Sequence, residues 1–293
     1  MTSIDTTTSL MNQPPEDHAM IKRILVALSG TPFTHTAIHH AVELARTHHA
    51  KVCGVTVTDI NRLEDIGPVP VGGGAAAHDL TEHRMASAKE SMQVSIDDFH
   101  AQCSEAGAAS VLHMEEGDSL DQFMQLSRYN DLIVVGLRGL FEYGVVHNSR
   151  DLVLKAISKG LRPLLAVTEE PREINKVIIA YNGSMEAAKT MKHFARLHLW
   201  PNAEIRVICI GKNDDADQLL ADAVDYLEEY GYTVDSEHRI GDAARVLLPA
   251  ADEWGADLIV MGSTSRKKLG RLIWGDTALA VLEHSTVPVF LSQ

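Results

Sequence analysis

The amino-acid sequence predicts an α/β fold built from two tandem doubly wound domains, each around a five-stranded parallel sheet. Two observations carry this prediction. Short runs rich in Ile, Val and Leu alternate with helical patterns, as in a parallel sheet covered by helices on both faces. The same order of elements then occurs a second time along the chain.

The repeat is visible in two pairs of landmarks. Residues 23–31 form an apolar run that ends in Ser-Gly-Thr, and residues 176–184 form a similar run that ends in Asn-Gly-Ser, 153 positions later. Residues 131–136 (DLIVVG) and 257–262 (DLIVMG) match 126 positions apart. We therefore expect one domain at residues 21–170 and a second at residues 174–293.

Each half is expected to alternate strand and helix throughout. In the first half, strands are expected in the run 23–31 and at 51–58, 110–114, 131–135 and 163–167, and helices at 36–45, 85–106, 120–127 and 150–159. In the second half, strands are expected in the run 176–184 and at 204–210, 233–239, 257–261 and 288–291, and helices at 187–195, 217–230, 244–254 and 276–284.

Two segments do not fit this alternation. Residues 1–20 are polar without helical or strand period, which predicts a disordered tail. Residues 61–83 contain a stretch rich in Gly and Pro that has no counterpart in the second half, and we expect a long, mobile loop there.

Composition excludes several classes of protein. The formal charge of −14 opposes non-specific binding to nucleic acid or to an anionic membrane. No apolar run is long enough to span a bilayer and the first residues lack a signal-peptide layout, so we expect a cytoplasmic protein. Cys53, Cys103 and Cys209 have no CxxC spacing and the histidines have no partners at ligand spacing, so neither a disulfide framework nor a metal site is expected.

The tips of the first and fourth strands are the expected ligand sites. Doubly wound sheets bind ligands beyond the carboxyl ends of the strands, where the strand order reverses. In the second half, the fourth strand is followed by a glycine-bearing loop that leads to a helix N-terminus, a place that attracts anions. Arg266, Lys267 and Lys268 lie in this loop and could neutralise phosphates.

Together these motifs resemble the universal stress protein family in its tandem, two-domain form. The resemblance covers nearly all of residues 23–292 and includes the Gly-Asp turns 117–118 and 241–242 and the closing sequence HSTVPVF at 284–290. It implies an adenine-nucleotide-binding-like fold and, in members that hold ATP or AMP, the motif Gly-x2-Gly-x9-Gly-Ser/Thr after the fourth strand. It also implies an aspartate at the tip of the first strand that contacts the nucleoside.

The resemblance carries over to the second half with departures. Ser265 replaces the second glycine, Asp276 replaces the hydroxyl residue, and Asn182 replaces the aspartate. Asp276 repels phosphate and can instead cap the following helix, and Asn182 can serve as a turn residue. The expected nucleotide-binding residues are Asn182, Gly183, Ser184, Cys209, Gly262, Ser265, Arg266, Lys267, Gly275, Asp276 and Thr277.

The first half has lost more of the motif. Gly136 and Gly139 are kept, but Ser149 stands where the third glycine is expected and Ser29 where the aspartate is expected. The expected degenerate site consists of Ser29, Gly30, Thr31, Gly136, Gly139 and Ser149.

The resemblance implies a stress-associated, non-enzymatic signalling protein that binds an adenine nucleotide, ATP or AMP, in its second half. The alternative is a nucleotide-free scaffold with two degenerate sites. Common catalytic motifs are absent from the sequence, and weak ATP hydrolysis is the only enzymatic activity considered. We expect an intramolecular pseudo-dimer in which the last strands of the two halves pair. We also expect an unidentified protein partner. A further homodimer is left open.

Overall fold

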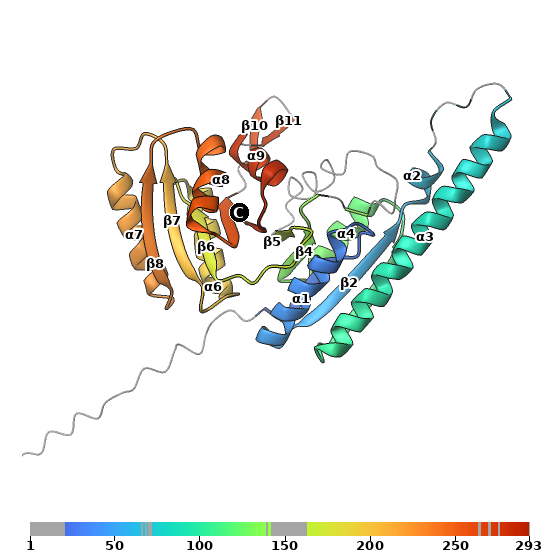
Figure 1. The fold of residues 1–293 in the computed structure, drawn as a ribbon, viewed down its shortest axis with the longest axis horizontal. Coiled ribbons are helices and arrows are strands. Elements are labelled where there is room, and N and C mark those ends of the chain that lie inside the picture. Colours follow the sequence, from blue (N-terminus) through green and yellow to red (C-terminus); the bar gives the residue numbers. More distant parts are fainter. Residues whose placement is uncertain are drawn as a thin grey trace, which may run out of the picture.

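The computed structural model describes residues 21–65, 67, 69, 72–138, 140–141, 163–262, 265–268, 271–274 and 276–292, with only the backbone described at 61, 62, 265–268, 271–274 and 276. The expected tail 1–20 and the expected helix 150–159 lie outside these residues. Figure 1 shows two α/β halves side by side.

The first half contains the predicted alternation of strands and helices. Its elements are β1 (Arg23–Ala27), α1 (Thr34–His48), β2 (Lys51–Thr58), α2 (Ile60–Glu64), α3 (Gly74–Glu105), β3 (Ser110–Glu116), α4 (Ser119–Ser127), β4 (Leu132–Gly136) and β5 (Leu164–Val167). α1 packs on α3 and on β1 and β4, while α4 packs on β2 and β3.

The second half repeats this order. Its elements are β6 (Lys176–Ala180), α6 (Met185–Leu197), β7 (Glu204–Ile210), α7 (Ala216–Glu228), β8 (Thr233–Arg239), α8 (Ala243–Trp254), β9 (Leu258–Gly262), β10 (Ser265–Lys268), β11 (Arg271–Trp274), α9 (Asp276–His284) and β12 (Val289–Ser292). α6 covers β9 and β12, α7 covers β7 and β8, and α8 and α9 lie together.

Among the described residues, the strands other than β10 and β11 form one ten-stranded sheet in the order β3-β2-β1-β4-β5-β12-β9-β6-β7-β8. Strands are parallel within each half, so each half is a doubly wound domain of the predicted class. The strand order reverses at β1 and β4 in the first half and at β6 and β9 in the second. In doubly wound sheets, ligands bind beyond the carboxyl ends of the strands at such a reversal point.

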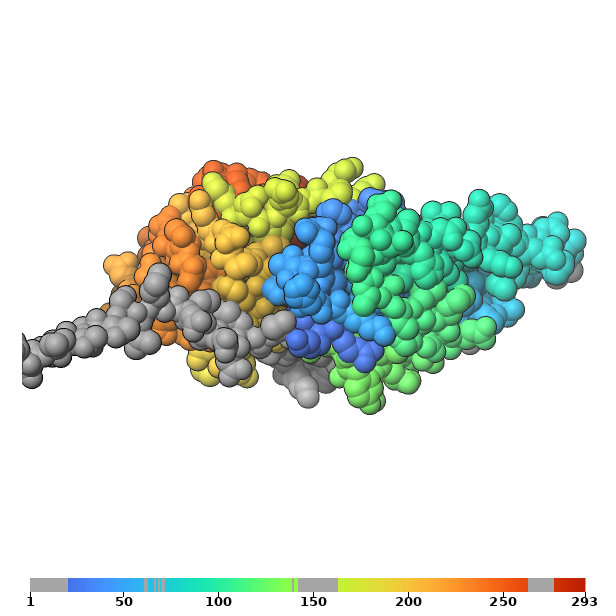
Figure 2. Space-filling view, turned by 90° about the horizontal axis from the view of Figure 1, so that it is seen from below, coloured from blue at the N-terminus to red at the C-terminus, as the bar shows by residue number. Residues whose placement is uncertain are grey.

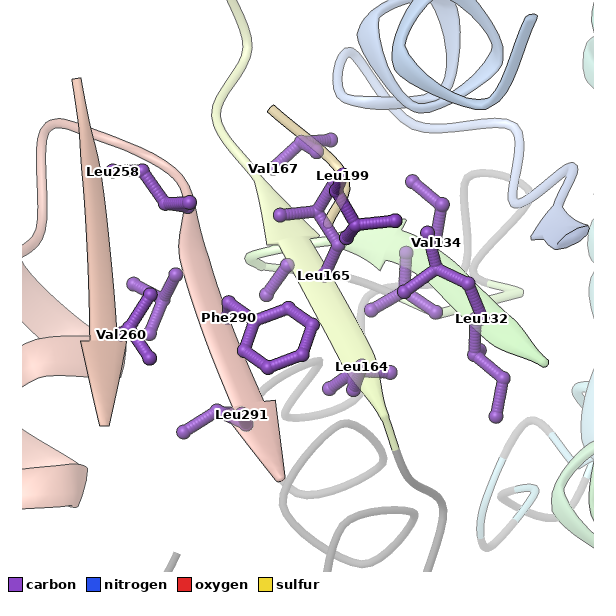
Figure 3. Close-up of a cluster of buried hydrophobic side chains, with 14 of the residues drawn as sticks. Leu132, Val134, Leu164, Leu165, Val167, Leu199, Leu258, Val260, Phe290 and Leu291 are labelled. Carbon is purple, nitrogen blue, oxygen red and sulfur yellow. The ribbon is translucent and has the colours of Figure 1, made fainter. Parts of the chain in front are cut away.

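The two halves join through their last strands, as the sequence predicted. β12 pairs antiparallel with β5, and Phe290 lies opposite Leu165. Both side chains are fully buried in a cluster that also contains Val134 and Val260 (Figure 3). Pairing removes two apolar edge strands that would otherwise be exposed to other chains. Figure 2 shows the surfaces of the two halves in direct contact.

The segment 61–83 differs from the predicted loop. α2 occupies its beginning, and α3 starts at Gly74 instead of near residue 85. Ala75, Ala76 and Ala77 belong to the first turns of α3, and alanine has the highest helix propensity. Their propensity outweighs the preceding glycines, so α3 becomes a 32-residue helix that projects past the sheet (Figure 1).

The loop after β9 also differs from the sequence prediction. It contains an antiparallel hairpin, β10–β11, in which Ser265 lies opposite Trp274 and Lys267 opposite Leu272. Residues such as Ile273 and Trp274 favour the extended conformation. The loop was expected to bind phosphates through its backbone N–H groups. Some of the N–H groups of β10 and β11 instead pair with carbonyl groups of the other strand.

Candidate functional site

A solvent-connected hollow of about 140 Å³ lies at the reversal point of the second half, above the ends of β6 and β9. The residues that line it come from β6 and the turn after it, α6, β7, α8, β9 and α9. They are Ala180, Tyr181, Asn182, Ser184, Ala187, Ile208, Ile210, Ala243, Leu247, Met261, Gly262, Thr277 and Ala278. The hollow thus lies at the tips of the first and fourth strands of the second half, and ligand binding there stays a prediction.

The wall contributed by β7 is apolar. Ile208 and Ile210 line the hollow, and because successive side chains of a strand point to opposite faces, Cys209 points away from it. Burial raises the pKa of the Cys209 thiol, against a smaller lowering by a hydrogen bond with Asn213. The structure therefore does not bring Cys209 to the predicted site, and the residues on either side of it take the packing role.

The turn after β6 is held by its own polar side chains. Asn182 Oδ1 accepts a hydrogen bond from the Ser184 backbone N–H at 3.1 Å, and Ser184 Oγ accepts one from the Ala187 N–H at 3.2 Å. Gly183 has φ +75°, and a Cβ there would come within 3.0 Å of Leu219. Asn182 and Ser184 line the hollow, so both act as turn residues and also present polar atoms to it.

Gly262 at the end of β9 allows a close backbone approach. A Cβ at this position would meet the backbone of Glu186 and Ala187 at 3.2 Å. The glycine therefore lets the first turn of α6 pack against β9. This packing brings the N-terminus of α6 to the edge of the hollow.

Three helices begin at the hollow. Ala187 lies in the first turn of α6, Ala243 is the first residue of α8, and Thr277 is the second residue of α9. The first turn of a helix has backbone N–H groups without partners in the helix and a partial positive charge. Their convergence produces a potential that favours an anion.

Acidic residues at the same three helix ends weaken this potential. Glu186 lies in the first turn of α6, Asp242 precedes α8, and Asp276 begins α9. The Asp242 side chain makes no capping hydrogen bond. A bound anion at this site therefore needs a further positive charge nearby.

Basic residues occur in β10. Arg266, Lys267 and Lys268 belong to this strand, and Ser265 begins it. The structure describes their backbone, and Gly275 lies outside the described residues. The phosphate-binding roles of Arg266, Lys267, Lys268 and Gly275 therefore stay predictions.

Tyr181 is the only titratable residue among the described residues that line the hollow. Burial raises the pKa of its phenol, and the charges of Asp222 and Cys209 raise it further. The phenol therefore stays protonated at neutral pH and can donate a hydrogen bond.

In the first half, the expected site residues Gly30 and Thr31 line a hollow of about 670 Å³ between the turn after β1 and the helices α1 and α3. Ser29 is 1% exposed, Thr31 N–H donates to Thr34 Oγ1 at 3.1 Å, and Gly30 has φ 65° in the turn. Gly136 is buried at the end of β4. Gly139 and Ser149 lie outside the described residues.

Sequence reasoning missed much of the wall in the second half. The missed residues are apolar or aromatic: Ala180, Tyr181, Ala187, Ile208, Ile210, Ala243, Leu247, Met261 and Ala278. Strand alternation could have identified Ile208 and Ile210. The Gly-Asp turn before α8 could have identified Ala243.

Within the described residues, no three His, Cys, Asp or Glu side chains are grouped so as to hold a metal ion. The helices in the described part of the chain include none with both the length and the apolar character needed to cross a membrane.

The fold and the hollow define a class of protein: a tandem pair of doubly wound α/β domains with a ligand-sized recess at a strand-order reversal. The family model described as "Universal stress protein family" matches residues 20–154 and 173–292. The chain belongs to the universal stress protein family.

Three similar proteins match over nearly the whole length of this chain. The curated protein Universal stress protein Slr1230 of Synechocystis sp. is 24% identical over 297 residues, which cover 92% of this chain and 99% of that protein. A universal stress protein structure from Archaeoglobus fulgidus matches with a TM-score of 0.66 and 17% identity, covering 92% of this chain and 98% of that one. The structure of PA1789 from Pseudomonas aeruginosa matches with a TM-score of 0.58 and 17% identity, covering 93% and 92% of the two chains. The structural matches support the fold.

Proposed function

We propose that this protein is a stress-associated, non-enzymatic binding protein whose second half holds an adenine nucleotide, ATP or AMP. The chain would consist of two domains, residues 21–170 and residues 174–293, of which the second holds the nucleotide. That it works in the cytoplasm and through a protein partner stays a prediction from the sequence.

One observation supports the site above all. The hollow at β6 and β9 combines an apolar wall, Ile208 and Ile210, with the N-termini of α6, α8 and α9. An apolar wall suits a planar base, and helix N-termini suit phosphate. Family membership supports adenine as the base.

The composition of the wall supports binding without catalysis. General acid–base chemistry requires a titratable group whose pKa lies near the working pH. The described wall offers only Tyr181 in this role, and the pKa of that residue is raised. Slow hydrolysis of ATP is therefore the most that we expect.

The experiment that tests the proposal begins with the purified full chain. Denaturation followed by chromatography and mass spectrometry identifies any nucleotide that copurifies. Calorimetric titration of the nucleotide-free protein with ATP, and separately with AMP, should then show one equivalent bound. Absence of both copurified nucleotide and measurable binding would overturn the proposal.

The alternative function is a nucleotide-free scaffold, and a specific observation favours it. Asn182, Gly183 and Gly262 each have a role within the fold: a turn hydrogen bond, a left-handed backbone and a close helix approach. The fold alone therefore accounts for the presence of these three residues, without a bound ligand. A chain that binds neither ATP nor AMP but retains a partner in pull-down experiments would support this alternative.

A further inference from the structure

A further hollow, the junction hollow, lies where the two halves meet at the amino edge of the sheet. It is lined by α1, by residues 172–175 before β6 and by residues 199–203 before β7. His48 Nε2 lies 3.1 Å from the Leu199 carbonyl oxygen, so the end of α1 touches the second half here. The volume of about 430 Å³ is within the range of pockets that hold small molecules. Because the chain enters β6 and β7 at this edge, the junction hollow lies at the opposite end of these strands from the hollow at β6 and β9.

The lining of the junction hollow includes a buried imidazole without a partner. His40 is 5% exposed, and its Nε2 has no hydrogen-bond partner among the described residues. Its counterpart in the repeat, His193, has a partner, because His193 Nδ1 lies 2.7 Å from Ser292 Oγ. Buried polar atoms are normally paired. The pKa of His40 is lowered to about 4, mainly by burial, so the ring is neutral at pH 7 and its Nε2 can accept a hydrogen bond when Nδ1 carries the proton.

The charged side chains of the lining leave a negative charge unpaired. Glu43 is paired with Arg46 at 2.7 Å, and Arg172 lies 3.6 Å from Asp257. Glu173 also lines the junction hollow, and among the described residues no basic side chain lies within ion-pair distance of it. The formal charge of the whole chain, −14, has the same sign. The junction hollow therefore favours a positively charged ligand.

An aromatic ring and two amides complete the polar and apolar character of the wall. Trp200 lines the junction hollow, and its ring stacks on Phe194 with centroids 6.2 Å apart. Indole rings attract organic cations through their faces and also pack against apolar groups. Asn175 and Asn202 line the same space and add carbonyl acceptors. The wall thus combines acceptors, negative charge and an aromatic surface.

We propose that the junction hollow binds a small organic cation that has N–H donors and a short apolar chain, of the alkylguanidinium class. The N–H groups donate to His40 Nε2 and to the Glu173 carboxylate, and the apolar chain packs on Trp200. The cation contacts α1 of the first half and both loops of the second, so its binding stabilises the joint between the halves. This proposal concerns a separate site and does not require that the second half bind nucleotide.

The test titrates butylguanidinium calorimetrically into the purified full chain at pH 7. Butylurea is the reference compound, because it has a similar shape and N–H donors but carries no charge. We expect one equivalent of butylguanidinium to bind, and butylurea to bind at least about tenfold more weakly, since hydrogen bonds between charged groups are stronger than neutral ones. Equal affinity for the two compounds, or no binding of butylguanidinium, would overturn the proposal.

Two variants locate the cation. Glu173→Gln removes the unpaired carboxylate at an exposed position, so the chain should fold, and the Kd for butylguanidinium should rise about threefold to tenfold. His40→Leu removes the buried acceptor and should raise the Kd by a similar factor. Glu170→Gln is the matched control, because it removes the same charge from an exposed position in the same connection, outside the lining, and should leave the Kd unchanged. An unchanged Kd in Glu173→Gln, or an equal rise in Glu170→Gln, would show that the cation does not bind in the junction hollow.

Discussion

Phe290 of β12 and Leu165 of β5 lie opposite each other across the antiparallel pairing that joins the two halves of the sheet. Both side chains are fully buried, and the Phe290 ring also packs edge to face on Phe194 of α6 with centroids 5.6 Å apart. The joint between the halves is therefore part of the core of each. This makes the two units one structural body.

Replacing Phe290 with Ala should lower the free energy of unfolding by about 3–5 kcal/mol, because it leaves a cavity in the shared core. Urea unfolding followed by far-ultraviolet circular dichroism reports both halves, and Trp fluorescence reports the second half, which contains all three tryptophans. The two transitions should coincide and shift together. A circular dichroism signal that keeps a native-like transition while the fluorescence transition shifts would contradict a shared core.

Tyr129→Ala is the control for this prediction. Tyr129 is 72% exposed, so its truncation removes little buried surface. Its effect should stay within about 0.5 kcal/mol.

Ala243→Trp should abolish ATP binding in the native background. Ala243 lines the hollow at the start of α8, and a Trp side chain there occupies the space beside Leu247 that a base would use. We expect the Kd for ATP to rise at least about a hundredfold, since the base loses its place on the wall. Calorimetry measures the change. The neighbouring Ala244 is not among the lining residues, so Ala244→Trp should leave the Kd unchanged; equal losses in both variants would refute the proposed position of the base.

Asp276→Asn should strengthen ATP binding. Asp276 begins α9, where a carboxylate takes the favourable potential of the helix N-terminus and repels a phosphate. Removing its charge should lower the Kd about threefold to tenfold at low ionic strength, with less effect at high salt. Asp217→Asn makes the same change in the first turn of α7, outside the lining, and should have no effect. A Kd for Asp276→Asn at or above that of the native protein would place the phosphates elsewhere.

Much of the fold could be predicted because the two halves share one pattern. The expected strands 51–58, 204–210 and 233–239 match β2, β7 and β8 residue for residue. β8 has the sequence TVDSEHR, which shows little apolar character, and only its position in the repeat identified it. Repetition thus supplied information that local propensity did not.

The remaining features depend on tertiary packing or on balanced local preferences. Glycines before Gly74 indicated a loop, yet the alanines after it extend α3 by several turns. The tip residues Asn182 and Gly262 were found from the motif, but the wall made by Ile208 and Leu247 consists of ordinary apolar residues. Which apolar residues meet at a site is decided by strand direction and helix placement, which single positions do not encode.

Acidification should destabilise the protein through His40. This residue of α1 is 5% exposed, and its Nε2 has no hydrogen-bond partner among the described residues. The pKa of His40 is lowered from its ordinary value of 6.5 to about 4, mainly by burial and to a smaller extent by the charge of His39, while the charge of Glu43 opposes the shift. The folded protein therefore keeps this imidazole neutral, whereas the unfolded chain binds a proton below pH 6.5.

Because the unfolded chain binds more protons between these two pKa values, stability falls as pH falls through this window and is unaffected by His40 well above it. The linkage amounts to about 2 kcal/mol between pH 7 and pH 5. His40→Leu removes the titration together with an unpartnered buried polar atom, so its free energy of unfolding should fall about 2 kcal/mol less than that of the native protein over the same range. Urea unfolding at both pH values measures this difference. His78→Leu, at a side chain that is 71% exposed, should keep the native pH dependence. If His40→Leu also keeps it, the folded protein accepts a proton at His40 as readily as the unfolded chain does.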